Sequence, residues 1–129
     1  MQLLLDTSVL IDALRLRRGR RRWLAERVRR GDTLATSTIN LAEVYAGMRP
    51  EEEARTKGFL SALESHEVTA SVAEIAGKLK RQWSQRGRTL TLADTLVAAV
   101  ALQQGCSLAT DDRKDFPMPG LQLCKLPGE

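Results

Sequence analysis

Three acidic side chains each stand alone in a segment of the chain that is otherwise uncharged. They are Asp6 in residues 1–11, Glu43 in residues 37–48 and Asp94 in residues 89–104. A carboxylate within an apolar segment is costly to bury unless hydrogen bonds or a cation compensate its charge. These three acids are therefore the first candidates for chemistry.

A fourth acidic group lies in the segment ATDDRKDF, which contains Asp111, Asp112 and Asp115. Carboxylates that converge repel one another, so at neutral pH they must hold protons or share a cation. That cation is either an arginine of the chain or a divalent metal, and the residues alone leave both alternatives open. Oxygen ligands without histidine or thiolate suit Mg²⁺ or Mn²⁺, as one ion or two.

Each acid also has a purely structural interpretation. Asp6 suits the N-cap of a helix, and Asp94 suits the first turn of one. Glu43 lies opposite the apolar stripe of its helix, where side chains face solvent. Acids are also common in turns such as the one that contains the fourth group. Only convergence of the four segments at one place would favour the chemical interpretation.

A carboxylate-bound Mg²⁺ beside a basic surface suits the hydrolysis of a phosphodiester. Such a metal polarises a phosphoryl oxygen and lowers the pKa of a bound water, so no covalent protein nucleophile is needed. The chain has one histidine, His66, which leaves almost no material for a catalytic triad or a histidine-rich metal site. We therefore expect metal-activated water to be the nucleophile.

Strand-like and helix-like segments alternate along the chain and must position these acids. Expected strands cover residues 2–5, 33–36, 67–69, 106–109 and 121–126. Expected helices cover residues 8–14, 38–48, 72–85 and 89–104, together with a stretch around Trp23 and a stretch opened by Pro50. We expect Ser71 to cap the helix at 72–85 and Gly105 to end the helix at 89–104. A turn or short helix is expected at residues 110–116. This βαβ spacing predicts a three-layer α/β/α sandwich with a central, mainly parallel sheet of four to five strands, in a single domain of residues 1–129. In such sheets the functional crevice lies beyond the carboxyl ends of the strands.

The segment RLRRGRRRWLAERVRR, residues 15–30, contains nine arginines and one acid. Arginine forks bind phosphate, and Trp23 offers a surface on which a base could stack. An equally open interpretation is that this segment is a solvated helix with Trp23 packed inward. A third interpretation is that the segment binds the acidic surface of a protein partner. The residues expected to dock an RNA backbone are Arg17, Arg18, Arg20, Arg21 and Arg22.

The overall composition limits the class of protein. A net charge of +4 and an isoelectric point of about 9.5 favour anionic partners. Cys106 and Cys124 have no metal-ligand or redox spacing, so we expect two reduced core thiols. The N-terminus lacks the features of a signal peptide, and no apolar run reaches the roughly 18 residues needed to span a bilayer. We expect a soluble, cytoplasmic protein without a membrane partner.

Four motifs follow one another along nearly the whole chain: LLLDTSVLID, STINLAEVYAGM, LTLADTLVAAVALQQG and LATDDRKDF. In this order, and in a chain of this length, they resemble the PIN-domain nucleases and, within them, the VapC-type toxins of bacterial toxin–antitoxin pairs. The resemblance implies a PIN-like α/β fold. It also implies that Mg²⁺ or Mn²⁺ is bound by acids in these motifs.

The metal-binding acids of that family correspond to four positions of this chain. The fourth is the third residue of a T-x-D/N pattern, which here reads Thr110-Asp111-Asp112. The positions that the resemblance assigns to the metal and to catalysis are Asp6, Glu43, Asp94 and Asp112.

Four further positions match supporting residues of the family. Asp115, which precedes a phenylalanine, would act through water or hold its loop. Thr7 and Ser8 match hydroxyl positions that would orient a water or the scissile phosphate, although both also suit a helix cap. Thr110 has the same two interpretations.

The resemblance implies an endoribonuclease that forms a homodimer and is blocked by a VapB-type antitoxin. Its RNA targets would be tRNA, rRNA or mRNA, and it would contact promoter DNA only through the antitoxin complex. The alternative is a non-catalytic PIN-like module that binds RNA or a protein, although acids facing phosphates would not help such a binder. A receiver or phosphatase domain would need a lysine at a later strand end, and Thr110-Asp111-Asp112 offers none.

Overall fold

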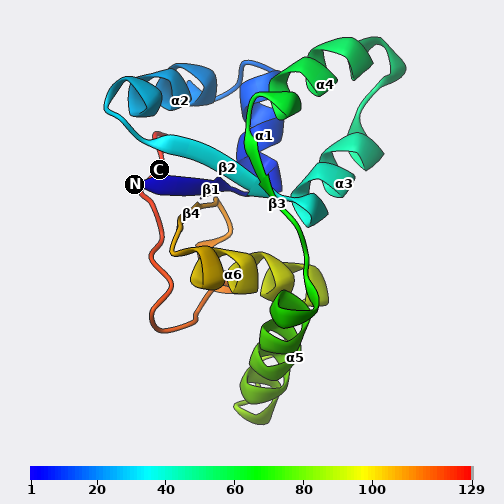
Figure 1. The fold of residues 1–129 in the computed structure, drawn as a ribbon, viewed down its shortest axis with the longest axis vertical. Helices are drawn as coiled ribbons and strands as arrows, with labels where there is room; N and C mark the ends of the chain where they lie inside the picture. Colours follow the sequence, from blue (N-terminus) through cyan, green and yellow to red (C-terminus); the bar gives the residue numbers. More distant parts are fainter. Residues whose placement is uncertain (129) are drawn as a thin grey trace.

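A parallel sheet of four strands organises the chain, as a computed structural model that describes residues 1–128 shows (Figure 1). The strands are β1 (Gln2–Leu5), β2 (Thr33–Ser37), β3 (Glu64–His66) and β4 (Ser107–Ala109), in the order β3-β2-β1-β4. Every pairing between neighbouring strands is parallel. The carboxyl ends of all four strands therefore lie at one edge of the sheet.

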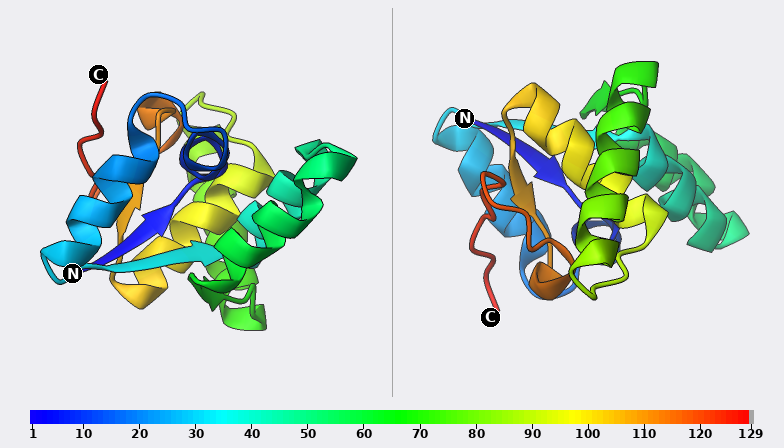
Figure 2. Two further views of the ribbon diagram at one scale, coloured as in Figure 1. Left: turned by 90° about the horizontal axis from the view of Figure 1, so that it is seen from above. Right: turned by 90° about the horizontal axis from the view of Figure 1, so that it is seen from below.

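Helices cover both faces of this sheet (Figures 1 and 2), which confirms the expected three-layer sandwich. One face carries α1 (Thr7–Leu14), α2 (Arg20–Arg29), α3 (Thr38–Gly47) and α4 (Glu53–Ser61), and the other carries α5 (Ala70–Gln85) and α6 (Leu92–Gln104). Single 3-10 turns occur at η1 (Pro50–Glu52) and η2 (Arg113–Asp115). Side chains of β1 alternate between two cores, with Leu3 and Leu5 packed under α1–α4 and Leu4 packed under α5 and α6.

The apolar sequence of α6 follows from its position. Residues 97–101 are all buried, because α6 lies between the sheet and α5. A helix enclosed on several sides is apolar around most of its circumference. Only the N-terminal turn of α6, which contains Asp94, reaches the edge of the sheet where charge is tolerated.

The third strand differs from the expected residues 67–69. The observed β3 is made of polar residues, Glu64, Ser65 and His66, and pairs with one neighbour only, at the edge of the sheet. Backbone pairing with β2 stabilises a strand there that side-chain hydropathy does not indicate. Thr69, rather than the expected Ser71, caps α5 by accepting a hydrogen bond from the amide of Val72.

The expected last strand, residues 121–126, is also wrong as a strand. This segment makes one isolated parallel bridge, between Leu108 and Leu123. The amide of Leu108 donates to the carbonyl of Gln122 and its carbonyl accepts from the amide of Cys124, both at 2.8 Å. β4 itself is only three residues long, so it offers little backbone for further pairing. Leu126 is nevertheless buried in the core.

Cys106 is buried and Cys124 is half-buried. None of the helices in residues 1–128 is both long enough and apolar enough to cross a membrane.

Candidate active site

The edge formed by the carboxyl ends of the strands collects the acidic motifs. β1 lies inside the sheet between β2 and β4, and Asp6 follows it directly. The amide of Asp6 donates to the carbonyl of Ala109 at 3.0 Å, which joins the ends of β1 and β4. The chain first crosses from β1 to β2 and only later returns to β4 on the other side of β1, and a crevice forms at such a reversal of strand order.

Asp6 is the centre of a hydrogen-bond network. Its Oδ1 accepts from the Thr7 amide at 2.9 Å and from Asn40 Nδ2 at 3.0 Å, and its Oδ2 accepts from Thr110 Oγ1 at 2.6 Å. Burial raises the pKa of Asp6, and the Glu43 charge adds to this, while hydrogen bonds from Thr110, Thr7 and Asn40 partly offset the rise. Asp6 caps α1, as its structural interpretation expects, but capping accounts for only one of these bonds.

Thr7 connects Asp6 to Glu43. The Thr7 hydroxyl donates to Glu43 Oε1 at 2.6 Å and accepts from Asn40 Nδ2 at 3.0 Å. Asn40 is completely buried and is held by Ser37, whose hydroxyl lies 2.5 Å from Asn40 Oδ1 at the start of α3. Asn40 and Glu43 are three residues apart and so share one face of α3. Glu43 is thus exposed on its helix but still joined to the network around Asp6.

Thr110 positions the loop that follows β4. Its hydroxyl donates to Asp6 and accepts from the amide of Asp112 at 3.0 Å. Burial raises the pKa of Asp112, and the negative charges of Asp6, Asp115 and Asp111 raise it further. Asp112 therefore lies within electrostatic range of Asp6 and Asp115.

Asp94 lies half-buried in the first turn of α6, where Thr91 accepts a hydrogen bond from its amide at 3.1 Å. Burial raises the pKa of Asp94, Thr91 opposes the rise, and the charges of Asp6, Asp115 and Asp112 add to it. Acids from three distant parts of the chain thus raise one another's pKa values at this edge.

Arginine does not neutralise these acids. In residues 1–128 no lysine or arginine nitrogen lies within 4.0 Å of a carboxylate oxygen of Asp6, Glu43, Asp94, Asp112 or Asp115. No ion pair of residues 1–128 therefore offsets the repulsion within this cluster, which a hard cation would relieve. The donors are all oxygens, and this set fits Mg²⁺ or Mn²⁺.

The acids do not form a complete set of direct metal ligands within residues 1–128. Within the part of the chain that the structure describes, no three acidic, histidine or cysteine side chains are grouped closely enough to hold a metal ion as they stand. Mg²⁺ commonly keeps several waters and is held through one or two carboxylates. The arrangement therefore suits a hydrated cation better than a cage of four direct protein ligands.

Asp111 has a different role from its neighbours. It pairs with Arg20, with Nη2 to Oδ1 at 2.7 Å and Nη1 to Oδ2 at 3.4 Å, and Arg18 Nη1 lies 3.2 Å from its Oδ1. Burial alone would raise the pKa of Asp111, but the hydrogen bonds and charge of Arg20 and the charge of Arg18 lower it overall. Asp111 therefore joins the site loop to the start of α2.

The Arg-rich segment only partly matches its expected role. Arg20 is completely buried, so the expectation that it docks RNA is wrong. Arg18 is bound to Asp111 and lies 3.6 Å from Asp12, while Arg17, Arg21 and Arg22 are exposed. Trp23 packs inward against the core below α2 rather than presenting its ring for stacking.

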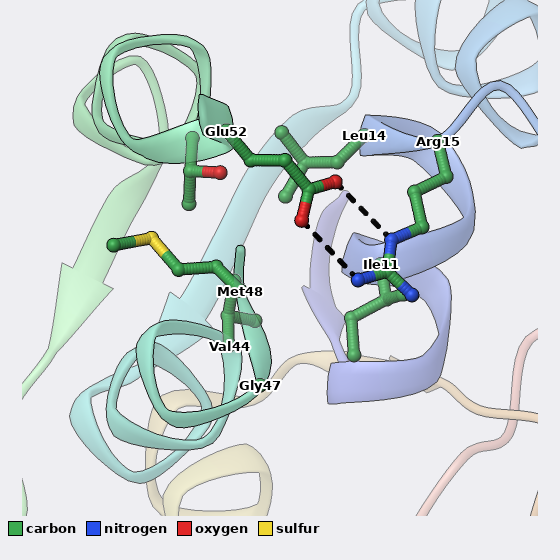
Figure 3. Close-up of a pocket in the computed structure, with 8 residues that line it drawn as sticks. Ile11, Leu14, Arg15, Val44, Gly47, Met48 and Glu52 are labelled. Atoms are coloured by element: carbon green, nitrogen blue, oxygen red, sulfur yellow. Dashed lines mark hydrogen bonds and ion pairs between the residues drawn. The ribbon is translucent and has the colours of Figure 1, made fainter. Parts of the chain in front are cut away.

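A pocket between α1, α3 and η1 is separate from the acids (Figure 3). Ile11, Leu14, Val44 and Met48 line it, and Arg15 crosses it to bind Glu52. The two hydrogen bonds of that pair are both 3.3 Å. None of the acidic residues at the sheet edge lines this pocket.

Two parts of the site escape prediction from the sequence. Asn40 has one signal, its position three residues after Ser37, which is the spacing of a capping box. The pairing of Arg20 with Asp111 joins residues 91 positions apart, and an arginine inside a run of arginines gives no sign of being buried.

Known proteins resemble this chain over most of its length. The family model described as PIN domain matches residues 3–117. Ribonuclease VapC19 of Mycobacterium tuberculosis is 35% identical over 120 residues, which are 92% of this chain and 96% of that protein. Ribonuclease VapC10 of the same species is 34% identical over 116 residues, which are 90% of this chain and 86% of that protein.

A solved structure has a similar backbone. The crystal structure of VapBC2 from Rickettsia felis bound to a DNA fragment from their promoter contains a chain that is 26% identical in sequence. The two chains superpose with a TM-score of 0.84 over 95% of this chain and 97% of the other.

Proposed function

Because this chain belongs to the PIN-domain family and, within it, to the VapC proteins, we propose that it is a divalent-metal-dependent endoribonuclease, the toxin of a toxin–antitoxin pair. One observation carries the proposal: acids from separate motifs lie at the carboxyl edge of the sheet, where hydrogen bonds join several of them, and none is in an ion pair within residues 1–128. Relatives that match this chain over most of their length are named ribonucleases.

The proposed metal-holding residues are Asp6, Glu43, Asp94 and Asp112, acting directly or through water. One or two bound Mg²⁺ or Mn²⁺ ions would supply charge stabilisation for a phosphoryl oxygen and a lowered pKa for water. Asp6 is oriented for this task because Thr110 and Asn40 hold its two oxygens. Thr110 also sets the position of Asp112 through its amide.

The remaining polar groups have supporting roles in this proposal. Thr7 orients Glu43 by donating to Oε1 at 2.6 Å. Asp115, half-buried in η2, adds negative charge beside Asp94 and Asp112. The buried Ser8 hydroxyl has no hydrogen-bond partner in residues 1–128 and would orient a water or the scissile phosphate. The single histidine, His66, is bound to Gln2 Oε1 at 2.8 Å, so the proposed hydrolysis uses water as nucleophile and no histidine base.

The proposal extends to partners. A VapB-type antitoxin would hold the activity in check, since the similar chain from Rickettsia felis was solved as VapBC2 on promoter DNA. This chain would contact such DNA only through its antitoxin complex. A homodimer is the proposed assembly, and cytoplasmic tRNA, rRNA or mRNA is the proposed substrate.

The direct test is RNA cleavage by the purified chain with Mn²⁺ and with EDTA. Cleavage should require the metal and should be lost in Asp94→Asn and Asp6→Asn, with circular dichroism melts showing that both variants fold. Glu43→Gln should also be inactive, while Glu74→Gln, an exposed glutamate on α5, should cleave like the wild type. Wild-type cleavage by Asp94→Asn would refute the assignment. RNA binding that persists in EDTA without any cleavage would instead indicate a non-catalytic module.

A further inference from the structure

The segment from Ile75 to Ala93 is basic and contains no acid. Its five charged residues are Lys78, Lys80, Arg81, Arg86 and Arg88. Most arginines of the other basic segment, residues 15–30, are already paired with carboxylates. Those in ion pairs are Arg15, Arg18, Arg20, Arg27, Arg29 and Arg30.

Three arginines near the end of α5 have no ion-pair partner in residues 1–128. Arg81, Arg86 and Arg88 are exposed, and no carboxylate of residues 1–128 lies within ion-pair distance of them. The two lysines of the segment are engaged, since Lys78 pairs with Glu74 at 3.8 Å and Lys80 donates to the carbonyl of Leu90 at 2.6 Å.

Arg88 reaches the acidic edge. The guanidinium of Arg88 donates to the carbonyl of Lys114, which lies in η2 between Asp112 and Asp115. Both views of Figure 2 show the loop between α5 and α6 beside the η2 turn. The same loop leads directly into the first turn of α6 with Asp94. Positive side chains thus adjoin the proposed cleavage site.

Trp83 holds two of these guanidinium groups in place. The Cζ atom of Arg86 lies 5.0 Å from the centroid of the Trp83 ring, and that of Arg88 lies 5.9 Å away. The Trp83 ring itself packs against the core of α5 and α6. Cation–π contact restricts the arginine side chains, so they lose less entropy on binding, and each planar fork matches a phosphate.

We propose that Arg86, Arg88 and Lys114 form a phosphate strip that holds the backbone of substrate RNA on one side of the cleavage site. This inference rests on the proposed function and locates its substrate. Carboxylates at the site repel the phosphates that flank the scissile bond, and the phosphate strip offsets that repulsion beside the site. Because the guanidinium groups of Arg86 and Arg88 cover Trp83, the phosphate strip binds the RNA backbone and Trp83 does not stack on bases.

The test measures RNA affinity in an Asp94→Asn background, which separates binding from cleavage. We expect Arg86→Gln with Arg88→Gln to weaken binding of a single-stranded RNA oligonucleotide about 10-fold or more at moderate salt. The slope of log affinity against log salt should fall by about 0.7 for each phosphate that the variant no longer neutralises. The control is Arg29→Gln with Arg30→Gln, two exposed arginines at the C-terminal end of α2, and this variant should change affinity less than about twofold.

A second readout uses the active chain. KM for RNA should rise in the Arg86/Arg88 variant while kcat stays within about twofold, because the strip binds substrate equally before and during reaction. Lys114→Gln tests the part of the phosphate strip that lies in η2, and it should also weaken RNA binding. Circular dichroism melts confirm that each variant is folded.

The outcomes separate the two proposals. RNA cleavage by the wild type with unchanged affinity in the Arg86/Arg88 variant would overturn the strip and leave the nuclease intact. Unchanged RNA affinity with loss of co-purified antitoxin would also overturn it, because the surface would then bind protein. RNA binding that depends on Arg86 and Arg88 without cleavage by the wild type would support the strip while the proposed catalysis fails.

Discussion

The buried pair of Arg20 and Asp111 makes a sharp prediction about stability. The Arg20 side chain is 0% exposed and that of Asp111 is 16% exposed. Removing one partner of a buried ion pair leaves the other charge without compensation, at a cost of about 3–5 kcal/mol. Asp111→Leu does this to a guanidinium that has no access to water, so we expect the full cost.

Removing the arginine instead of the aspartate should lower the free energy of unfolding by less. In Arg20→Met the Asp111 carboxylate keeps some contact with solvent and keeps Arg18 at 3.2 Å. We expect a loss of about 1–3 kcal/mol, in the range for a partly compensated buried polar group. The double variant, with Arg20→Met and Asp111→Leu, has no unpaired buried charge and should be more stable than the sum of the single effects predicts.

These values convert to measurable midpoints. For 129 residues, an unfolding entropy of about 2.1 cal/mol/K per residue makes 1 kcal/mol equal to about 4 °C in Tm. Asp111→Leu should therefore lower Tm by roughly 11–18 °C. Urea unfolding followed by circular dichroism gives the free energies directly.

The exposed pair of Arg29 and Glu26 supplies the control. Arg29 is 72% exposed, and Arg29→Met should change stability by less than about 1 kcal/mol. A loss below about 1 kcal/mol in Asp111→Leu, or strict additivity in the double variant, would refute the reasoning about the buried charge.

Three further substitutions test other contacts. Hydrogen bonds from Arg15 and the Arg49 amide lower the pKa of Glu52 from 4.5 to about 2. The ionised Glu52 therefore stabilises the folded chain above pH 4.5, and this stabilisation is lost as the pH falls toward 2. Glu52→Gln should make the free energy of unfolding, measured in urea, depend less on pH between these values. Asn40→Ala removes the donor shared by Asp6 and Thr7 and should cost about 1–3 kcal/mol, and a value near zero would contradict the network. Thr110→Val removes a hydrogen bond that lowers the pKa of Asp6, so Mn²⁺ affinity at neutral pH, measured by calorimetry, should fall about 10-fold, and unchanged affinity would contradict the role of Thr110.

Most of the fold is predictable from the sequence because, in most segments, side-chain hydropathy and capping residues favour the element that forms. β1 contains three leucines and ends just before Asp6, and α6 is mostly apolar between its cap Thr91 and Gly105. Prediction failed where pairing with the sheet outweighed side-chain character. The polar β3 is a strand because it pairs with β2, and the apolar residues 121–126 are not one because β4 offers little backbone to pair with.

The candidate site divides in the same way. Isolated acids in uncharged segments are visible without a structure, and parallel strands bring their ends to one edge whatever the side chains do. The buried Asn40 and the Arg20–Asp111 pair are not visible, because each depends on a partner distant in the chain.

By itself, the sequence determined the type of chemistry, since it offers carboxylates and almost no histidine, and the order of strands and helices that carries them. Only the tertiary structure decided which charges are free. Packing buried Arg20 against Asp111 and left Arg86 and Arg88 exposed beside the acids. The physical reason is that the cost of a charge depends on its solvent access and its nearest partner, and both are set by contacts between residues far apart in the chain.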